Sequence, residues 1–75
     1  MEKINKEIGK IIANLRQEQN LSQEEFAELA QIHRTYVSQI ERGLKSPTIN
    51  ILVKISKALK INLSEIIVEL EKNKK

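Results

Sequence analysis

The first part of the chain carries apolar residues at the spacing of one helix face. Successive members of this stripe are one, three or four residues apart, which places them on the same side of a helix. They are Ile4, Ile8, Ile11, Ile12 and Leu15. The pattern predicts a helix over residues 3–19, and Asn20 is a typical residue at its end. No segment shows sustained alternation of apolar and polar residues, so the sequence predicts no strands.

Capping residues divide the rest of the chain into four shorter helices. Ser22, with Glu25 three residues later, has the sequence of a capping box and begins a second helix. Thr48 caps a fourth helix, and Asn62 with Glu65 forms another capping-box pair before a fifth. The residues expected to face inward are Phe26, Leu29, Ala30, Val37, Ile40, Glu41, Ile49, Leu52, Ile55 and Leu59. We therefore expect a compact all-α fold of five helices.

The second and third helices have the lengths and separation of a helix-turn-helix motif. Each spans about nine residues, and the tight turn Ala30-Gln31-Ile32 separates them. The third covers about residues 34–42 and ends at Gly43, because glycine readily adopts the left-handed conformation found after a helix. In such a motif the first helix lies across the DNA backbone and the second enters the major groove. We place the motif at about residues 22–42.

The outward face of the third helix carries side chains that suit DNA bases. Arg can donate two hydrogen bonds to guanine, Gln can pair with adenine, and Thr offers a methyl group and a hydroxyl. The outward residues are Arg34, Thr35, Ser38, Gln39 and Arg42. The face contains no carboxylate, because Glu41 falls on the inner side. An ordinary solvated face is the alternative, although such faces usually mix Glu with Lys.

Composition narrows the functional class. The chain has 75 residues, which allows one domain over residues 1–75 and is too short for most enzymes. It has no cysteine and one histidine, so we expect no metal and no cofactor. No apolar run approaches the roughly 18 residues of a membrane span, and the start MEKINKE lacks the apolar region of a secretory signal. We expect a cytoplasmic protein without a membrane partner.

Positive charge is concentrated in the middle of the sequence. The formal net charge is +3, but residues 33–60 contain six basic residues and one acidic residue, a net +5. This distribution is expected if one surface meets a polyanion such as double-stranded DNA. Lys45 and Ser46 in the loop, and Asn50 in the first turn of the fourth helix, either follow the DNA backbone or are simply exposed to solvent.

Two further surfaces have more than one interpretation. Glu24, Glu25 and Glu28 form a solvated acidic face, a metal cluster, or a contact for RNA polymerase beside the DNA. The fifth helix, over residues 63–71, is apolar on more than one side. Its surplus apolar residues either complete the core or form a homodimer interface, for which Ile67 and Leu70 are the first candidates, with Leu63 or Val68 helping. A two-fold dimer would set two recognition helices about 34 Å apart.

The chain resembles the lambda-repressor-like helix-turn-helix family, also called the Cro/repressor or XRE type. The resemblance covers about residues 6–70 and rests on the motifs LSQEEFA, IERG, PT and KALKINLSEI. The segment RTYVSQIERG is similar to the controller proteins of restriction–modification systems. The resemblance implies a non-enzymatic transcriptional regulator with five helices that binds a palindromic operator as a homodimer. Phage-type repressors and antitoxins share much of the pattern, and an interaction module that has lost DNA binding is a further alternative.

The resemblance also implies roles for matching residues. Gln23 matches a glutamine that contacts a DNA phosphate, and Tyr36 matches an aromatic residue that lies against the sugar-phosphate backbone. Arg34 and Thr35 fall where the recognition helix reads bases, with Ser38 and Gln39 further along. Apart from the resemblance, we also expect Arg42 to contact the DNA backbone, and Lys45, Ser46 and Asn50 keep the two interpretations given above. Arg16 and Glu41 match a structural ion pair that joins the first helix to the third.

Three residues depart from the family pattern. Gln31 stands where the turn often has Gly, which costs on the order of 1 kcal/mol if the residue is left-handed. His33 replaces the usual Ser, Thr or Asp cap of the third helix, so we expect either a frayed helix start or a different role such as a phosphate contact. Lys60 replaces a common Gly after the fourth helix.

Overall fold

Five helices and no strand make up the described part of the chain. The protein is described from a computed structural model that covers residues 2–72. The helices are α1 (Glu2–Glu18), α2 (Gln23–Ala30), α3 (Arg34–Glu41), α4 (Ile49–Ala58) and α5 (Leu63–Lys72). The all-α fold predicted from the sequence is therefore confirmed, with each boundary within about two residues of its expected place.

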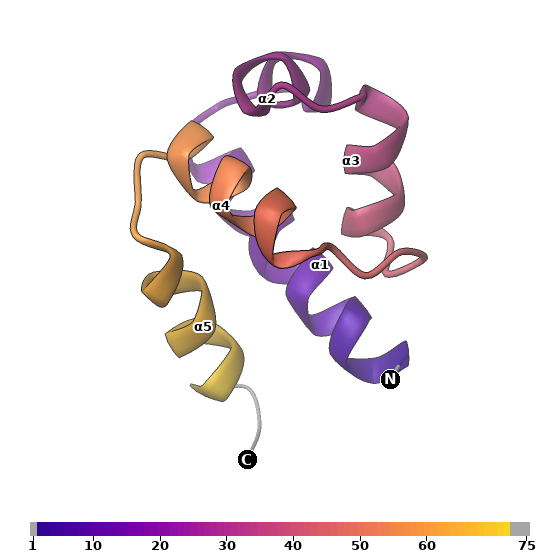
Figure 1. Ribbon diagram of the computed structural model, residues 1–75, viewed down its shortest axis with the longest axis vertical. Helices are drawn as coiled ribbons and strands as arrows, with labels where there is room; N and C mark the ends of the chain where they lie inside the picture. Colours follow the sequence, from indigo (N-terminus) through magenta and orange to yellow (C-terminus); the bar gives the residue numbers. More distant parts are fainter. Residues whose placement is uncertain (1, 73–75) are drawn as a thin grey trace.

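The helices are arranged around α1 and α4. In Figure 1, α4 crosses in front of α1, α2 lies across one end of both, and α3 and α5 lie on opposite sides. Helix α1 packs against α3 and α5, while α2 packs against α3 and α4. The recognition helix predicted from the sequence thus lies at one edge of the molecule, away from α5.

The expected capping residues begin the helices. The Ser22 hydroxyl accepts the Glu25 backbone N–H at 3.0 Å, and the Glu25 carboxylate accepts the Ser22 backbone N–H at 2.9 Å. The Thr48 hydroxyl accepts the backbone N–H of Ile51 at 3.1 Å. At α5, the Asn62 backbone N–H donates to the Glu65 carboxylate at 3.2 Å, which is one of the two bonds of the expected pair. These local contacts satisfy N–H groups that a helix start leaves without partners.

The core draws on all five helices. Its buried apolar members are Ile11, Ile12, Phe26, Ala27, Ala30, Val37, Ile40, Leu52, Ile55, Ala58, Leu59 and Ile66. The inward orientation expected of Leu29 and Ile49 is wrong, since they are 57% and 65% exposed. The buried arc of α2 runs from Phe26 to Ala27, which leaves Leu29 beyond its edge. In α4 the arc extends toward Ile51 and leaves Ile49, the first residue of the helix, outside.

Left-handed residues end four helical segments. Asn20, Gln31 and Lys60 have φ near 60°, and Gly43 has a φ of 78°. Gln31 is therefore left-handed, the case in which replacing the usual Gly has a steric cost. Its backbone N–H bonds back to carbonyls of α2, which closes the helix before the turn. Because only glycine adopts this geometry without steric cost, the left-handed conformation of Gln31 and of Lys60 each lowers the stability of the fold by about 1 kcal/mol.

Gly9 allows α1 and α3 to approach each other closely, a role that its place in the sequence does not indicate. A Cβ atom at Gly9 would lie 2.2 Å from the carbonyl oxygen of Ile40 and 2.8 Å from that of Glu41. Both oxygens belong to the backbone at the C-terminal end of α3, which cannot rotate away as a flexible side chain would. The absence of a side chain at Gly9 therefore helps to set the distance between α1 and the recognition helix.

We predict that Gly9→Ala lowers the free energy of unfolding by about 2 kcal/mol or more, because the added methyl group forces α1 and α3 apart. On an exposed helix face, exchanging Gly for Ala normally raises the free energy of unfolding by about 1 kcal/mol. A decrease at Gly9 would therefore show that the added methyl group meets α3. Urea denaturation monitored by circular dichroism measures the change. Lys10→Ala, at the neighbouring exposed position, is the control and should change stability by less than about 0.5 kcal/mol. A stabilised Gly9→Ala protein would contradict the close packing.

Candidate nucleic-acid interface

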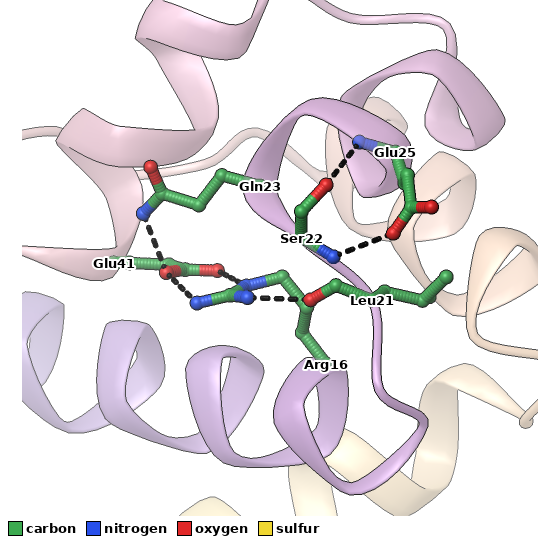
Figure 2. A network of polar contacts seen from close by, with 6 residues as sticks. All are labelled: Arg16, Leu21, Ser22, Gln23, Glu25 and Glu41. Atoms are coloured by element: carbon green, nitrogen blue, oxygen red, sulfur yellow. Dashed lines mark hydrogen bonds and ion pairs between the residues drawn. The ribbon is translucent and has the colours of Figure 1, made fainter.

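The carboxylate of Glu41 is the centre of a polar network that joins α1, α2 and α3 (Figure 2). Arg16 donates from Nε to Glu41 Oε2 at 2.7 Å and from Nη2 to Oε1 at 3.1 Å, a two-pronged ion pair. Arg16 also donates from Nη1 to the backbone carbonyl of Leu21 at 2.6 Å. Gln23 donates from Nε2 to Glu41 Oε1 at 2.9 Å. The structure thus brings together three of the predicted site residues, and both charged side chains are largely buried.

This network fixes the C-terminal end of the recognition helix. Glu41 is the last residue of α3, Arg16 lies in the last turn of α1, and Gln23 is the first residue of α2. A bidentate guanidinium–carboxylate pair restricts both distance and angle, so it holds α3 in one orientation. Glu41 also accepts a hydrogen bond from the NH₂ group of Gln23, the residue expected to contact a phosphate. The Gln23 side chain is half-buried at the start of α2.

We predict that Glu41→Gln lowers the free energy of unfolding by about 3 kcal/mol, because it leaves the Arg16 guanidinium buried without its anion. Arg16→Met combined with Glu41→Leu removes both charges and should cost less than the sum of the single changes. Chemical denaturation of the wild type, Arg16→Met, Glu41→Leu and the double variant measures the coupling free energy between the two side chains.

Lys72→Met is the matched control for this prediction. It removes the exposed Lys72–Glu69 pair, whose charged atoms are 3.6 Å apart, and should change stability by less than about 0.5 kcal/mol. A loss at Glu41→Gln no larger than that at Lys72→Met would show that the buried network does not hold α3.

The N-terminal end of the recognition helix is capped by His33. Its Nδ1 atom accepts the backbone N–H of Thr35 at 3.1 Å, and its backbone is extended, with φ of −72° and ψ of 142°, as a helix cap requires. Of the two alternatives left open for His33, the frayed helix start is therefore wrong, and a phosphate contact stays untested. The imidazole Nδ1 atom accepts from the first turn in the way that the side-chain oxygen of an Asn or Asp cap does.

The predicted base-reading residues follow one side of α3. Arg34 and Thr35, in the first turn, are exposed, whereas Ser38 and Gln39 are half-buried. Arg42 follows the helix as its C-cap and is also exposed. Glu41 is the only carboxylate of α3, and the Arg16 network holds it on the inner side. The outer surface of α3 therefore has donors and hydroxyl groups but no negative charge.

The predicted backbone contacts flank this face. Lys45 and Ser46 are exposed in the loop between α3 and α4, and Asn50 is exposed in the first turn of α4. Tyr36 is half-buried and packs against the core. Lys6 of α1 joins this region unexpectedly, since its side chain lies against Gly43, where a Cβ atom would be 2.6 Å from Lys6 Cγ. The sequence distance between the two residues gave no sign of this contact.

The other predicted surfaces lie elsewhere. On α5, Leu63 and Leu70 are partly buried against the core, while Ile67 and Val68 are 37% and 47% exposed. Glu24 and Glu28 are exposed on α2, and the Glu25 carboxylate is engaged in the capping box. A contact of this acidic side of α2 with RNA polymerase stays a prediction. None of the helices in the described part of the chain is long and apolar enough to cross a membrane.

Comparison with known proteins identifies the family. Residues 12–66 match the family described as Helix-turn-helix, which includes all of α2, α3 and α4. The chain belongs to the helix-turn-helix family. Other proteins with this type of domain include transcriptional regulators.

Its similar sequences include control proteins. The chain is 43% identical over 65 residues to control protein C.MunI from Mycoplasma sp, a match that covers 85% of this chain and 88% of that one. It is 42% identical over 48 residues to control protein C.BamHI from Bacillus amyloliquefaciens. That match covers 64% of this chain and 59% of C.BamHI, so this chain spans less than two thirds of the length of C.BamHI.

Solved helix-turn-helix structures share the arrangement of helices. The restriction-modification controller protein C.AhdI from Aeromonas hydrophila superposes with a TM-score of 0.81 at 32% identity, covering 83% of this chain and 94% of that one. SinR, a master regulator for biofilm formation whose structure was solved in complex with DNA, superposes with a TM-score of 0.76 at 36% identity, covering 80% and 97% of the two chains.

Proposed function

We propose that the protein is a sequence-specific transcriptional regulator that binds double-stranded DNA through α3. The observation that carries this proposal is the outer face of α3, which is exposed in its first turn, free of carboxylates and held at both ends. His33 caps its first turn, and the Arg16–Glu41 pair anchors its last residue. A rigid helix with this chemistry fits the major groove, whose base edges carry the acceptors that Arg and Gln recognise.

The side chains divide into base-reading and backbone-binding sets. Arg34 and Thr35 are the foremost base readers because they are exposed in the first turn, and Ser38 and Gln39 extend the reading along the helix. The predicted backbone contacts are Gln23, Tyr36, Arg42, Lys45, Ser46 and Asn50. His33, for which the sequence left a phosphate contact open, instead has its Nδ1 atom engaged by the backbone N–H of Thr35. Phosphate contacts of this kind position the helix and make affinity depend on salt, while base contacts set the sequence.

Selection from a random duplex library with the purified protein, near 0.15 M salt, tests this function. We expect enrichment of a palindrome, because two copies related by two-fold symmetry read two matching half-sites. An enriched single half-site would support DNA reading without the dimer. Binding without enrichment that fades as salt rises would leave only electrostatic attraction and would favour a protein-interaction module instead.

We predict that Arg34→Ala weakens binding to the selected duplex by about 1–3 kcal/mol and relaxes the preference at one base position. Arg42→Ala is the matched control, since it removes the same charge from the other end of α3. It should weaken all duplexes alike and reduce the slope of log affinity against log salt by about 1. Fluorescence anisotropy titrations over a set of single-base variants distinguish the two patterns. Uniform weakening by Arg34→Ala would remove it from the base readers.

We further propose that the regulator belongs to the controller type of restriction–modification systems. Its similarity to the control protein C.MunI extends over most of both chains, and C.AhdI shares its fold at 32% identity. A palindrome selected in the library experiment that also lies upstream of the protein's own gene and an endonuclease gene would support this assignment. A site beside phage or toxin genes would favour a phage-type repressor or an antitoxin.

The exposed apolar residues of α5 are the proposed homodimer interface. Ile67 and Val68 are adjacent and exposed, and Leu63 and Leu70 lie beside them, partly buried against the core. Exposed apolar side chains that repeat on two related copies bury each other when a two-fold dimer forms. The dimer would also bring two copies of α3 to the two half-sites of one operator.

We predict that Ile67→Glu converts the dimer into a monomer, because the new carboxylate would be buried without a partner. Analytical ultracentrifugation should show the change in mass, and affinity for the palindrome should fall at least tenfold. Leu29→Glu places the same charge at another exposed apolar position, on α2 and away from α5, and serves as the control. A dimer that survives Ile67→Glu would place the interface elsewhere.

A further inference from the structure

His33 satisfies three backbone N–H groups at the start of the recognition helix, one through its side chain and two through its carbonyl oxygen. Its imidazole Nδ1 accepts from Thr35, and its carbonyl oxygen accepts from Tyr36 at 3.0 Å and from Val37 at 3.1 Å. Since α3 has only eight residues, these bonds order nearly its whole first half. Arg34 and Thr35, the foremost candidates for base reading, lie directly within the capped turn.

The cap also specifies the chemical form of the ring. A neutral imidazole has one nitrogen that donates and one that accepts, and a charged imidazolium has no acceptor. Because Nδ1 accepts from Thr35, the proton must be on Nε2 and the ring must be uncharged. The hydrogen bond therefore selects one tautomer of the only histidine in the chain.

The absence of charge suits the place of this cap. In the first turns of α2 and α5 the chain has acidic residues, whereas α3 and α4 have none there, and His33 and Thr48 cap these two helices without charge. An aspartate cap would bond Thr35 equally well, but its negative charge would face the phosphates beside α3. A neutral cap orders the helix while keeping the positive end of its dipole available to DNA.

We infer that His33 is a positioning residue for DNA recognition: as the neutral, Nε2-protonated tautomer, it holds the first turn of α3 so that Arg34 and Thr35 meet the bases already ordered. This inference rests on the proposed function, because it concerns how the same helix reads DNA. It assigns to His33 a role that operates through Thr35 rather than through a direct contact with a base.

Three substitutions distinguish the effect of the helix cap on DNA binding from that of the imidazole ring itself. His33→Ala removes both and should weaken binding to the selected duplex about fivefold, the effect expected from the loss of one helix cap. His33→Ser restores a capping oxygen without an imidazole and should return the affinity to within about twofold of the wild type. His33→Asp restores the cap but adds a negative charge, so its affinity should fall below that of His33→Ser at low salt and approach it as salt rises.

Thr48→Ala is the matched control for loss of a cap as such. Thr48 makes an equivalent 3.1 Å bond to the backbone N–H of Ile51 at the start of α4. Removing it should lower thermal stability about as much as His33→Ala does. Only His33→Ala should also reduce the discrimination between the selected duplex and a duplex altered at the bases read by Arg34 and Thr35.

Nitrogen-15 NMR of the imidazole gives a direct measurement of the cap. Near pH 8, where an ordinary imidazole is uncharged, the spectrum of the single histidine should show the proton on Nε2, both in the free protein and in the DNA complex. A proton on Nδ1 would exclude the bond to Thr35 and would overturn the inference.

The binding results decide the rest. If His33→Ser is as weak as His33→Ala, the ring itself contacts DNA and the positioning role is wrong. If His33→Ala binds and discriminates like the wild type, the cap contributes nothing to recognition. A wild-type protein that enriches no sequence would instead overturn the proposed function, and the role in recognition with it, so this failure is distinguishable from the other two.

Discussion

The orientation of the recognition helix depends on one buried carboxylate. Glu41 accepts two bonds from Arg16 and one from Gln23, so a single side chain ties the end of α3 to the last turn of α1 and the first residue of α2. Burying a pair of charges has a large desolvation penalty, which the mutual attraction offsets only when the geometry is good and other polar atoms are satisfied. Here Leu21 accepts the remaining guanidinium donor. The network contributes orientation more than net stability, and orientation is what a helix that enters a groove requires.

Glu41 and Gly9 act on the same junction. The carbonyl groups of Ile40 and Glu41 approach the backbone of α1 at Gly9, within a distance that excludes any side chain. The ion pair lies two helical turns further along α1, at Arg16. One contact sets how near the two helices lie, and the other sets how α3 is turned relative to α1. Because Glu41 is directed inward, the outer side of α3 retains only neutral and positive groups.

Local chemistry made much of this fold predictable from the sequence. The caps at Ser22 and Thr48 involve residues three apart, so their side chains and the N–H groups that they satisfy lie within one turn of the chain. Leu29 and Ile49 were assigned to the core incorrectly, because helical spacing shows which residues share a face but not where a neighbouring helix stops covering it. The roles of Gly9 and Lys6 depend on residues more than thirty positions away. The cap at His33 could not be predicted for a different reason, since its bond to Thr35 depends on a ring orientation that the residue type does not specify.

The shortness of α3 gives a physical reason for the dimer that we propose through α5. At a rise of about 1.5 Å per residue, eight residues extend about 12 Å, which is roughly the length of three to four base pairs. A genome offers on the order of a million or more competing sites, so a half-site of that size occurs far too often to specify one operator. Two copies that act together double the length of DNA that is read, and their free energies of discrimination add. The dimer that we propose through α5 would supply this additional length. Ile67 and Val68 provide exposed apolar area for it on α5, at the opposite side of α1 from α3 in Figure 1, where pairing would leave the capped end of α3 free to meet DNA.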